Sequence, residues 1–343
     1  MASFNRYAQE DIAISTDKIT TNSWIDDTNK LSTFFTSSVQ SNFSSSNAQG
    51  NFFINVFKSE DPVGAQITSS AEFSVSYGHK AGSGSENFTN TTGSLGNTAT
   101  KCIYNQYRQL VYGDELSNFS FNSYESDDIY VINVNRSRYK HALKAGSLNI
   151  KLVGTETIEL TDDSTTTSGS ATITNLGRQF NLVSGSSGVM SGSNLNQTPA
   201  ESGSFGFFYP EAGIIIFNGE ALRNVDASNY LKGSNTSAQK RNQQFIDNIK
   251  AGANFELDSE EKISSQYFFT RVKNSEFNYS SNPSYIDTNG NLNHTSMADS
   301  PITYITTVGL YNDDNNLIAV AKLSQPLKKD FTTEALIRVK LDY

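Results

Sequence analysis

Short runs in which apolar and polar residues alternate recur along most of this chain. In residues 71–77, for example, Phe73, Val75 and Tyr77 alternate with polar neighbours, which predicts a strand with one buried face. The same alternation, or a run of β-forming residues, predicts further strands at residues 51–58, 119–121, 129–134, 148–153, 158–160, 205–209, 213–218, 255–257, 265–272, 302–311, 317–323 and 336–341. We therefore expect a mainly β fold, with β-sandwich-like domains and a few short peripheral helices.

Two segments have the period of an amphipathic helix instead. A helix over about residues 100–112, lying on a sheet, would carry one apolar stripe: Ile103, Tyr107, Leu110 and Val111. A second helix over about residues 238–251 would carry another: Phe245, Ile246 and Ile249. Residues 136–143 could form a short basic helix.

Changes in composition suggest four segments. Residues 1–50 place apolar groups without a regular period and then become rich in Ser and Asn, so we interpret them as an extended arm and linker. Residues 51–160 form the first β-rich domain. Residues 161–203 are mostly Ser, Thr, Gly and Asn, which indicates a linker or a long loop. Residues 204–343 form the C-terminal β-rich domain.

Charge and cysteine content exclude several kinds of partner and site. The formal net charge of −9 disfavours any nucleic-acid complex that neutralises many phosphates. A single cysteine, Cys102, excludes a disulfide within the chain and any cysteine-rich zinc site. No apolar run approaches the roughly 20 residues that a membrane-spanning helix needs, and residues 1–15 lack the basic start and apolar stretch of a signal peptide. We expect no nucleic-acid binding and no membrane insertion.

The histidines and the cysteine do not form a recognisable catalytic pattern. His79, His141 and His294 lie in separate polar contexts, without the spacing of a metal-binding helix. His79 follows a predicted strand, where a turn histidine is the simplest interpretation. Cys102 lies near a predicted helix start, but no histidine is close to it in sequence, so we expect a buried structural thiol.

The acidic residues also favour a structural interpretation. The pairs that begin at Asp127, Asp162 and Asp313 fall in predicted turns, where aspartate accepts local hydrogen bonds. Residues 287–291 (DTNGN) resemble a calcium loop in composition only, because the glycine stands at the fourth position and not the sixth. We expect no catalytic residue, no cofactor and no bound metal ion, and therefore no enzyme.

Two groups of sequence blocks are similar to one known family. In the C-terminal third the blocks are residues 267–272 (YFFTRV), 277–285 (FNYSSNPSY), 304–312 (YITTVGLYN), 317–327 (LIAVAKLSQPL) and 334–343 (EALIRVKLDY). Further blocks are residues 103–107 (IYNQY), 128–133 (DIYVIN) and 136–140 (RSRYK). Together they resemble virion structural proteins of T4-like cyanophages. The resemblance implies a place in the virion, in the phage tail and in particular the baseplate wedge.

The resemblance also implies partners, which are other tail or baseplate proteins and further copies of the chain. The irregular apolar residues of the predicted arm would be contacts that a neighbouring subunit buries: Phe4, Ile12, Trp24, Phe34 and Phe35. An alternative function is a carbohydrate-binding or fibre-like host-adsorption module, which would expose the aromatic cluster at residues 205–209. A glycan hydrolase is a third hypothesis, and it would need paired carboxylates in a groove.

Overall fold

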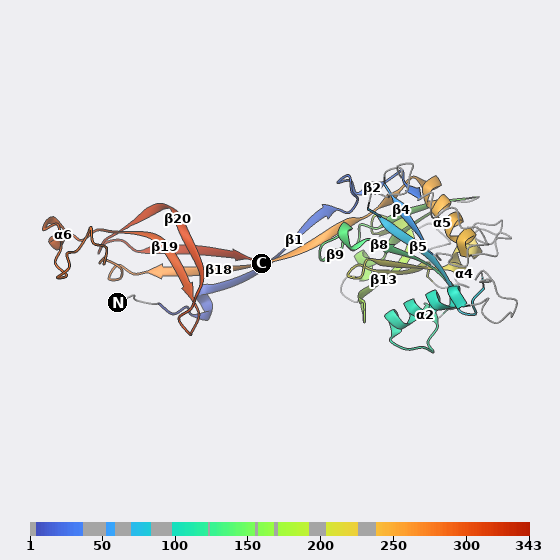
Figure 1. The fold of residues 1–343 in the computed structure, drawn as a ribbon, viewed down its shortest axis with the longest axis horizontal. Helices are drawn as coiled ribbons and strands as arrows, with labels where there is room; N and C mark the ends of the chain where they lie inside the picture. The colour runs from blue at the N-terminus through green and yellow to red at the C-terminus, as the bar shows by residue number, and fades with distance from the viewer. Residues whose placement is uncertain are drawn as a thin grey trace. The chain divides into compact units, whose positions relative to one another are not determined.

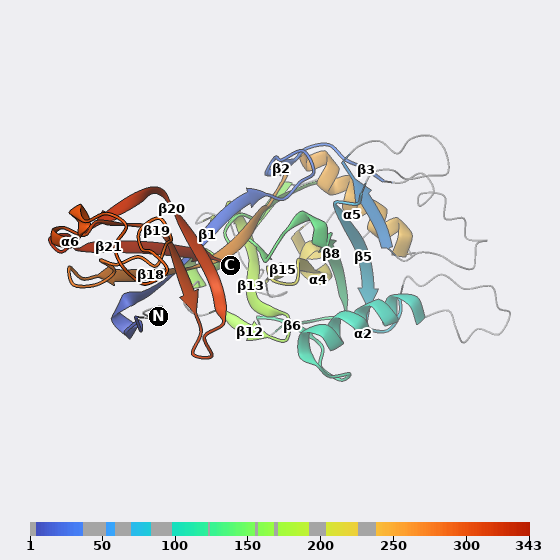
Figure 2. The same ribbon diagram turned by 60° about the vertical axis from the view of Figure 1, so that its left-hand side comes forward.

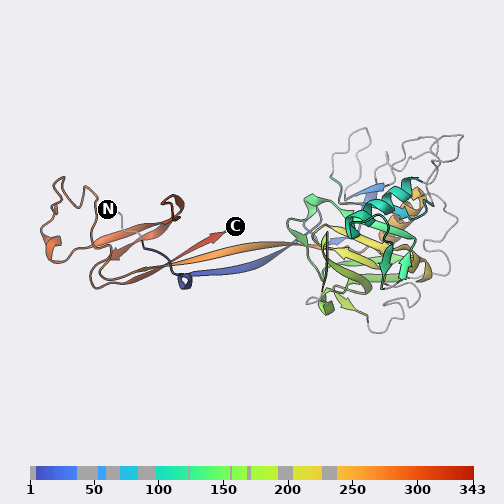
Figure 3. The same ribbon diagram turned by 90° about the horizontal axis from the view of Figure 1, so that it is seen from below.

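Antiparallel strands are the predominant secondary structure, and this confirms the expected mainly β fold. The computed structural model describes residues 5–36, 53–58, 70–83, 98–122, 124–154, 157–167, 171–191, 204–225 and 238–343 (Figure 1). The chain divides into two compact units. Unit 1 consists of Met1–Lys18 and Lys262–Tyr343, and unit 2 consists of Ile19–Glu261. Strands β1 (Ile12–Asn22) and β18 (Asp258–Val272) have residues in both units and pair with each other (Figure 3).

A single curled sheet forms the framework of unit 2. Its strands follow the order β2-β17-β10-β11-β13-β15-β16-β8-β5-β4-β3, and β12 and β14 pair with β13 beside this path. The bounds are β2 (Lys30–Leu31), β3 (Phe35–Thr36), β4 (Phe53–Phe57), β5 (Phe73–His79), β8 (Asp128–Val134), β10 (Asn149–Val153), β11 (Thr157–Asp162), β12 (Thr172–Thr174), β13 (Gly177–Ser186), β14 (Val189–Met190), β15 (Gly206–Tyr209), β16 (Ile214–Asn218) and β17 (Phe255–Glu256). Smaller elements of this unit are β9 (Ala142–Leu143), which pairs with β18, the one-turn helix η2 (Arg136–Arg138), α3 (Ser164–Thr167) and α4 (Gly219–Val225).

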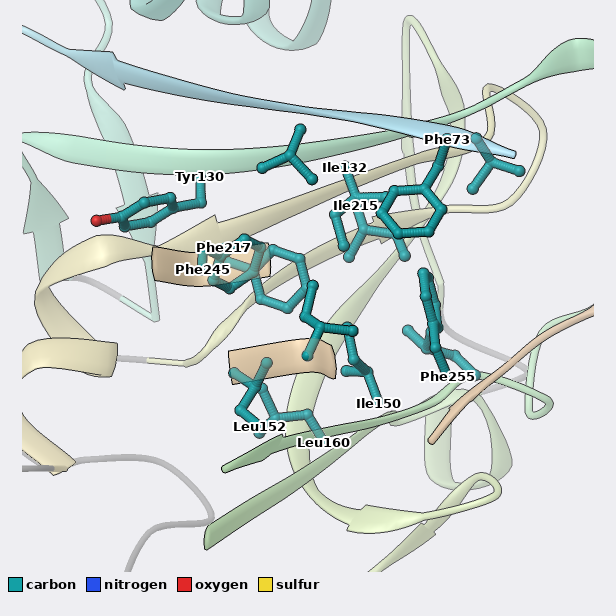
Figure 4. Close-up of a cluster of buried hydrophobic side chains, with 14 of the residues drawn as sticks. Phe73, Tyr130, Ile132, Ile150, Leu152, Leu160, Ile215, Phe217, Phe245 and Phe255 are labelled. Atoms are coloured by element: carbon teal, nitrogen blue, oxygen red, sulfur yellow. The ribbon is translucent and has the colours of Figure 1, made fainter. Parts of the chain in front are cut away.

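Helix α5 (Ala238–Gly252) packs between facing parts of the curled sheet, against β10 and β5. The ring of Phe245 of this helix stacks on Tyr130 and meets Phe217 edge-to-face, with ring centroids 5.0 and 5.1 Å away (Figure 4). A Cβ added to Gly252 would lie 2.0 Å from the carbonyl oxygen of Lys151, so only glycine allows the helix end to approach β10 this closely. The helix predicted at about residues 238–251 is therefore confirmed, and it belongs to the core rather than the periphery.

The other face of the sheet is covered by helix α2 (Thr98–Tyr112) and the hairpin of β6 (Phe119–Phe121) and β7 (Tyr124–Ser126). Figure 2 shows α2 and α5 on opposite sides of β5. Gly78 permits close packing, since a Cβ there would lie 2.8 Å from the backbone nitrogen of Tyr104. The helix expected over residues 100–112 is confirmed.

The buried stripe of α2 differs from the expected one. Tyr104, Tyr107 and Val111 are buried, whereas Leu110 is 38% exposed. The close approach of α2 to β5 at Gly78 turns position 104 toward the sheet. Position 110 then lies away from the face formed by positions 104, 107 and 111.

Strand β8 explains why apolar residues run almost without interruption in the middle of the chain. Ile129 and Val131 pack in the core beside α2, while Tyr130 and Ile132 pack in the core beside α5. A strand covered on both faces needs apolar residues at consecutive positions. β16, which pairs with β8, follows the same rule.

Unit 1 has a much thinner core. A three-stranded sheet of β1, β18 and β21 (Ala335–Asp342) faces the hairpin of β19 (Thr303–Tyr311) and β20 (Leu317–Lys329). The hydrophobic cluster between them contains three buried side chains, Val308, Leu310 and Val339. The short helices η1 (Gln9–Asp11) and α6 (Ser296–Asp299) complete the described elements of this unit.

The division of the chain differs from the four expected segments. Strands from residues 51–160 and 204–343 share one sheet, because β8 pairs with β16 and β10 pairs with β17. Residues 161–203 contain β13, which lies between β11 and β15 in that sheet and is therefore not a linker. The basic segment 136–143 forms only the single turn η2 and then strand β9.

The described part of residues 1–50 belongs to the fold rather than to a separate arm. The Trp24 ring packs against Phe73 and Phe255, and its Nε1 donates a 3.0 Å hydrogen bond to the carbonyl oxygen of Phe255. Phe34 also packs against Phe73. Trp24 and Phe34 find these partners because β2 and β3 join opposite ends of the curled sheet.

Candidate assembly surface

A hydrogen-bonded cluster of Arg241, Tyr77 and Asp128 links helix α5 to the sheet of unit 2. Arg241 Nη1 donates to the Tyr77 hydroxyl at 2.6 Å and lies 3.7 Å from Asp128 Oδ2. The hydroxyl in turn donates to Asp128 Oδ2 at 3.2 Å, and the guanidinium lies over the Tyr77 ring. Asp128, which we expected in a turn, starts strand β8 and is buried. These contacts give the carboxylate a structural role in joining three elements.

A second buried carboxylate lies at the end of β11. The backbone nitrogen of Gly146 donates to both carboxylate oxygens of Asp162, at 2.9 and 3.0 Å, and the nitrogen of Ser164 donates to Oδ1 at 3.2 Å. Burial raises the pKa of Asp162, and the hydrogen bonds from Ser164 and Gly146 oppose part of that rise. Ser164 is the first residue of α3 and Gly146 belongs to the segment before β10, so this aspartate holds the two segments together.

The histidine and cysteine candidates show no catalytic arrangement. The backbone nitrogen of Ala81 donates to His79 Nδ1 at 3.0 Å, as expected of a histidine in a turn. The expectation of a buried Cys102 is wrong, because this residue lies on the exposed side of α2. Among the described residues, no three His, Cys, Asp or Glu side chains gather closely enough to hold a metal ion.

Unit 1, in contrast, exposes many large apolar side chains. Those on the hairpin β19–β20 and on β21 that are well exposed are Tyr304, Tyr311, Leu317, Ile318, Val320 and Leu336. Four of them, Tyr311, Leu317, Ile318 and Val320, lie on the two strand ends that meet at the hairpin turn, and we call these four the hairpin patch. Apolar groups that recur on one element in this way are typical of protein–protein contact surfaces.

Open strand edges accompany these side chains. Among the described strands, β19 and β20 pair only with each other, and β21 pairs only with β18. The main-chain N–H and C=O groups along an unpaired edge can accept another strand. The surface of unit 1 therefore offers both apolar contact area and main-chain hydrogen bonds.

A cavity of about 620 Å³ lies within unit 1 beside β19. The strand contributes five lining residues, Ile305, Thr307, Val308, Gly309 and Tyr311. The N-terminal segment contributes Asn5, Arg6 and Tyr7, and β18 contributes Thr270 and Val272. The Tyr7 hydroxyl and Thr270 Oγ1 are 2.5 Å apart, which holds the N-terminal segment against β18.

The expected assembly contacts occupy different environments. Trp24 and Phe34 are each 1% exposed and form part of the core of unit 2, so no neighbour is needed to bury them. Phe35 is half-buried in β3, with Lys250 Nζ 5.7 Å from its ring centroid. Ile12, at the start of β1, is exposed, and Phe4 lies outside the described residues.

The hairpin patch was not identified as a contact surface from the sequence, because the pattern at residues 302–311 and 317–323 was used only to predict strands. The run 317–321 (LIAVA) is apolar at every position, which in unit 2 marks a strand covered on both faces. In unit 1 the β19–β20 hairpin is covered on one face only, and Ile318 and Val320 remain exposed on the other. Apolar residues on both faces of a short hairpin are therefore the sequence signal that indicates this exposed patch.

The aromatic cluster at residues 205–209 does not form an exposed binding face. Phe205, Phe207, Phe208 and Tyr209 are all buried in the cores of unit 2. This removes the particular surface on which the carbohydrate-binding alternative depended.

In comparisons with protein-family models, curated proteins and solved structures, no match to the chain is found. Separately, no helix within the described residues is long and apolar enough to cross a membrane.

Proposed function

We propose that this chain is a non-enzymatic structural component of a contractile-tailed phage virion, a baseplate wedge or tail assembly subunit held by contacts between subunits. The observation that carries the proposal is the surface of unit 1, where large apolar side chains and open strand edges occur together. The sequence blocks that resemble virion proteins of T4-like cyanophages supply the kind of particle.

The physical argument starts from the cost of leaving the hairpin patch in water. Ile318 is 66% exposed and Val320 is 58% exposed, and burying such side chains against a neighbour removes apolar area from water at about 25 cal/mol per Å². The hydrophobic cluster between the two layers of unit 1 contains three buried side chains among the described residues, so this unit gains little from burial on its own. A neighbouring subunit would complete its second apolar face.

Complementation with charged variants tests the proposal. Ile318→Lys places a charge in the hairpin patch, and we expect a folded chain that no longer enters virions. Ile173→Lys is the matched control, because Ile173 is a similarly exposed isoleucine (73%) on β12 of unit 2. Incorporation should persist in the control. If Ile318→Lys enters virions as well as the wild type does, the hairpin patch is not an assembly contact.

A further inference from the structure

Strand β19 is an unprotected edge. Its nine residues, Thr303–Tyr311 (TYITTVGLY), include neither a charged residue nor a proline. Proteins usually protect an exposed edge with charges, proline or a bulge. The partner strand β20 has such protection: it carries Lys322, Lys328 and Pro326, and its register shifts between Thr307 and Ile305 of β19. The lack of charged residues and proline in β19 is typical of an edge that pairs with another strand when the protein is assembled.

The cavity beside β19 provides room for another strand. Its lining includes the consecutive residues Thr307 and Val308, whose side chains belong to opposite faces of the strand, so the cavity follows the strand edge. No residue of β20 lines it, whereas Thr270, Val272 and Ile337 of the facing sheet do, so the cavity lies between that sheet and the side of β19 that β20 leaves open.

Of the N-terminal residues that line the cavity, Tyr7 is held to β18 by its hydrogen bond with Thr270 and forms part of the cavity wall. Arg6 and Asp313, which lie 3.9 Å apart, are almost wholly exposed and can move aside.

The distribution of charge favours a second copy of the chain as the occupant. Unit 1 contains ten Lys and Arg residues against eleven Asp and Glu residues, a net charge of −1. Unit 2 therefore carries −8 of the chain's −9. Two copies that meet through unit 1 bring together surfaces that are nearly neutral, whereas contact through unit 2 would oppose two acidic surfaces.

We infer that β19 of one copy pairs with β19 of a second copy, antiparallel across a two-fold axis. The pairing joins the two hairpins into one four-stranded sheet, and it brings no like charges together because β19 has none. This inference rests on the proposed function, which assigns unit 1 as the unit that contacts other subunits, and it names the partner as a second copy of the chain.

Self-association of the full-length chain tests the inference. Sedimentation velocity over a concentration series should show a reversible monomer–dimer equilibrium for the wild type. Thr307→Lys places a lysine on the cavity side of β19 and should raise the dissociation constant at least about tenfold. Gln325→Lys, at an exposed position of β20, adds the same charge and should leave the constant nearly unchanged. Each lysine lowers the net negative charge of the chain, so weaker association of Thr307→Lys cannot result from increased overall repulsion.

Hydrogen exchange on the wild type provides a test that does not depend on folding of a variant. Amides of Thr303–Tyr311 should exchange more slowly at concentrations where the dimer forms than in the dilute monomer. A chain that stays monomeric at every concentration, or a dimer that β19 does not protect, overturns the inference. A monomeric chain that still enters virions would overturn it while leaving the proposed function intact.

Discussion

The Tyr77 hydroxyl donates a hydrogen bond to the buried carboxylate of Asp128, and Arg241 approaches both groups from helix α5. The two bonded residues lie on neighbouring strands, β5 and β8, so the contact joins these strands where β8 begins and also holds the helix. A polar group buried at such a junction stabilises the fold only while its charges remain together.

Arg241→Ala should therefore be strongly destabilising. Removing the cation beside the buried Asp128 carboxylate should lower the free energy of unfolding by about 3–5 kcal/mol, measured by urea denaturation. Asp247→Ala changes an exposed residue of the same helix and should cost less than about 0.5 kcal/mol. Similar losses from the two variants would show that the Arg241 contacts contribute no specific stability.

Helix α2 gives a second pair of matched positions. Val111 is buried against the sheet, so Val111→Ala should lower the free energy of unfolding by about 1.5–3 kcal/mol. Leu110 is adjacent and partly exposed, and Leu110→Ala should cost clearly less, about 0.5–1 kcal/mol. Thermal or urea denaturation of both variants is the measurement, and the reverse order would mean that α2 is rotated from its position here.

Local pattern predicted the elements of this chain far better than their grouping. The strands at Phe73, Ile132 and Leu310 and both long helices follow from the spacing of apolar residues. Which strands pair does not follow from spacing, because β8 reaches β16 and β10 reaches β17 across long intervening segments. A sequence divided by composition therefore separates strands that share one sheet.

The face that a helix buries was predicted less well than the helix itself. In α2 the tyrosines at positions 104 and 107 are buried together with Val111, while Leu110 is not, because the helix backbone approaches Gly78. The assembly surface was also misplaced. Aromatic residues without a period suggested an arm, but Trp24 and Phe34 find distant partners in the sheet, as Phe255 and Phe73 show. Such long-range contacts leave no local signal.

The raised pKa of Asp162 predicts a pH-dependent stability term. Because the folded state binds the proton more tightly than the unfolded chain, whose carboxyl keeps its usual value of about 3.8, this residue destabilises the fold increasingly as pH rises through its folded pKa. Asp162→Asn cannot ionise. The free energy of unfolding of the variant should therefore improve relative to the wild type as pH rises above about 4.

Denaturation of both proteins at several pH values measures this difference directly. Carboxyls far from position 162 titrate alike in the two proteins and cancel in the comparison, so the difference reports position 162 together with its neighbour Asp163. A difference that is constant with pH, or one that favours the wild type at higher pH, would mean that Asp162 is not held in a desolvated site.

The most direct test of the proposed structural role is the presence and copy number of this chain in purified virions. Quantitative mass spectrometry should find it in particles from a lysate that contains it, at a fixed ratio to the other tail proteins that persists through repeated purification. Its absence from intact particles, or a ratio that falls with each purification step while the particles stay infectious, would contradict the account.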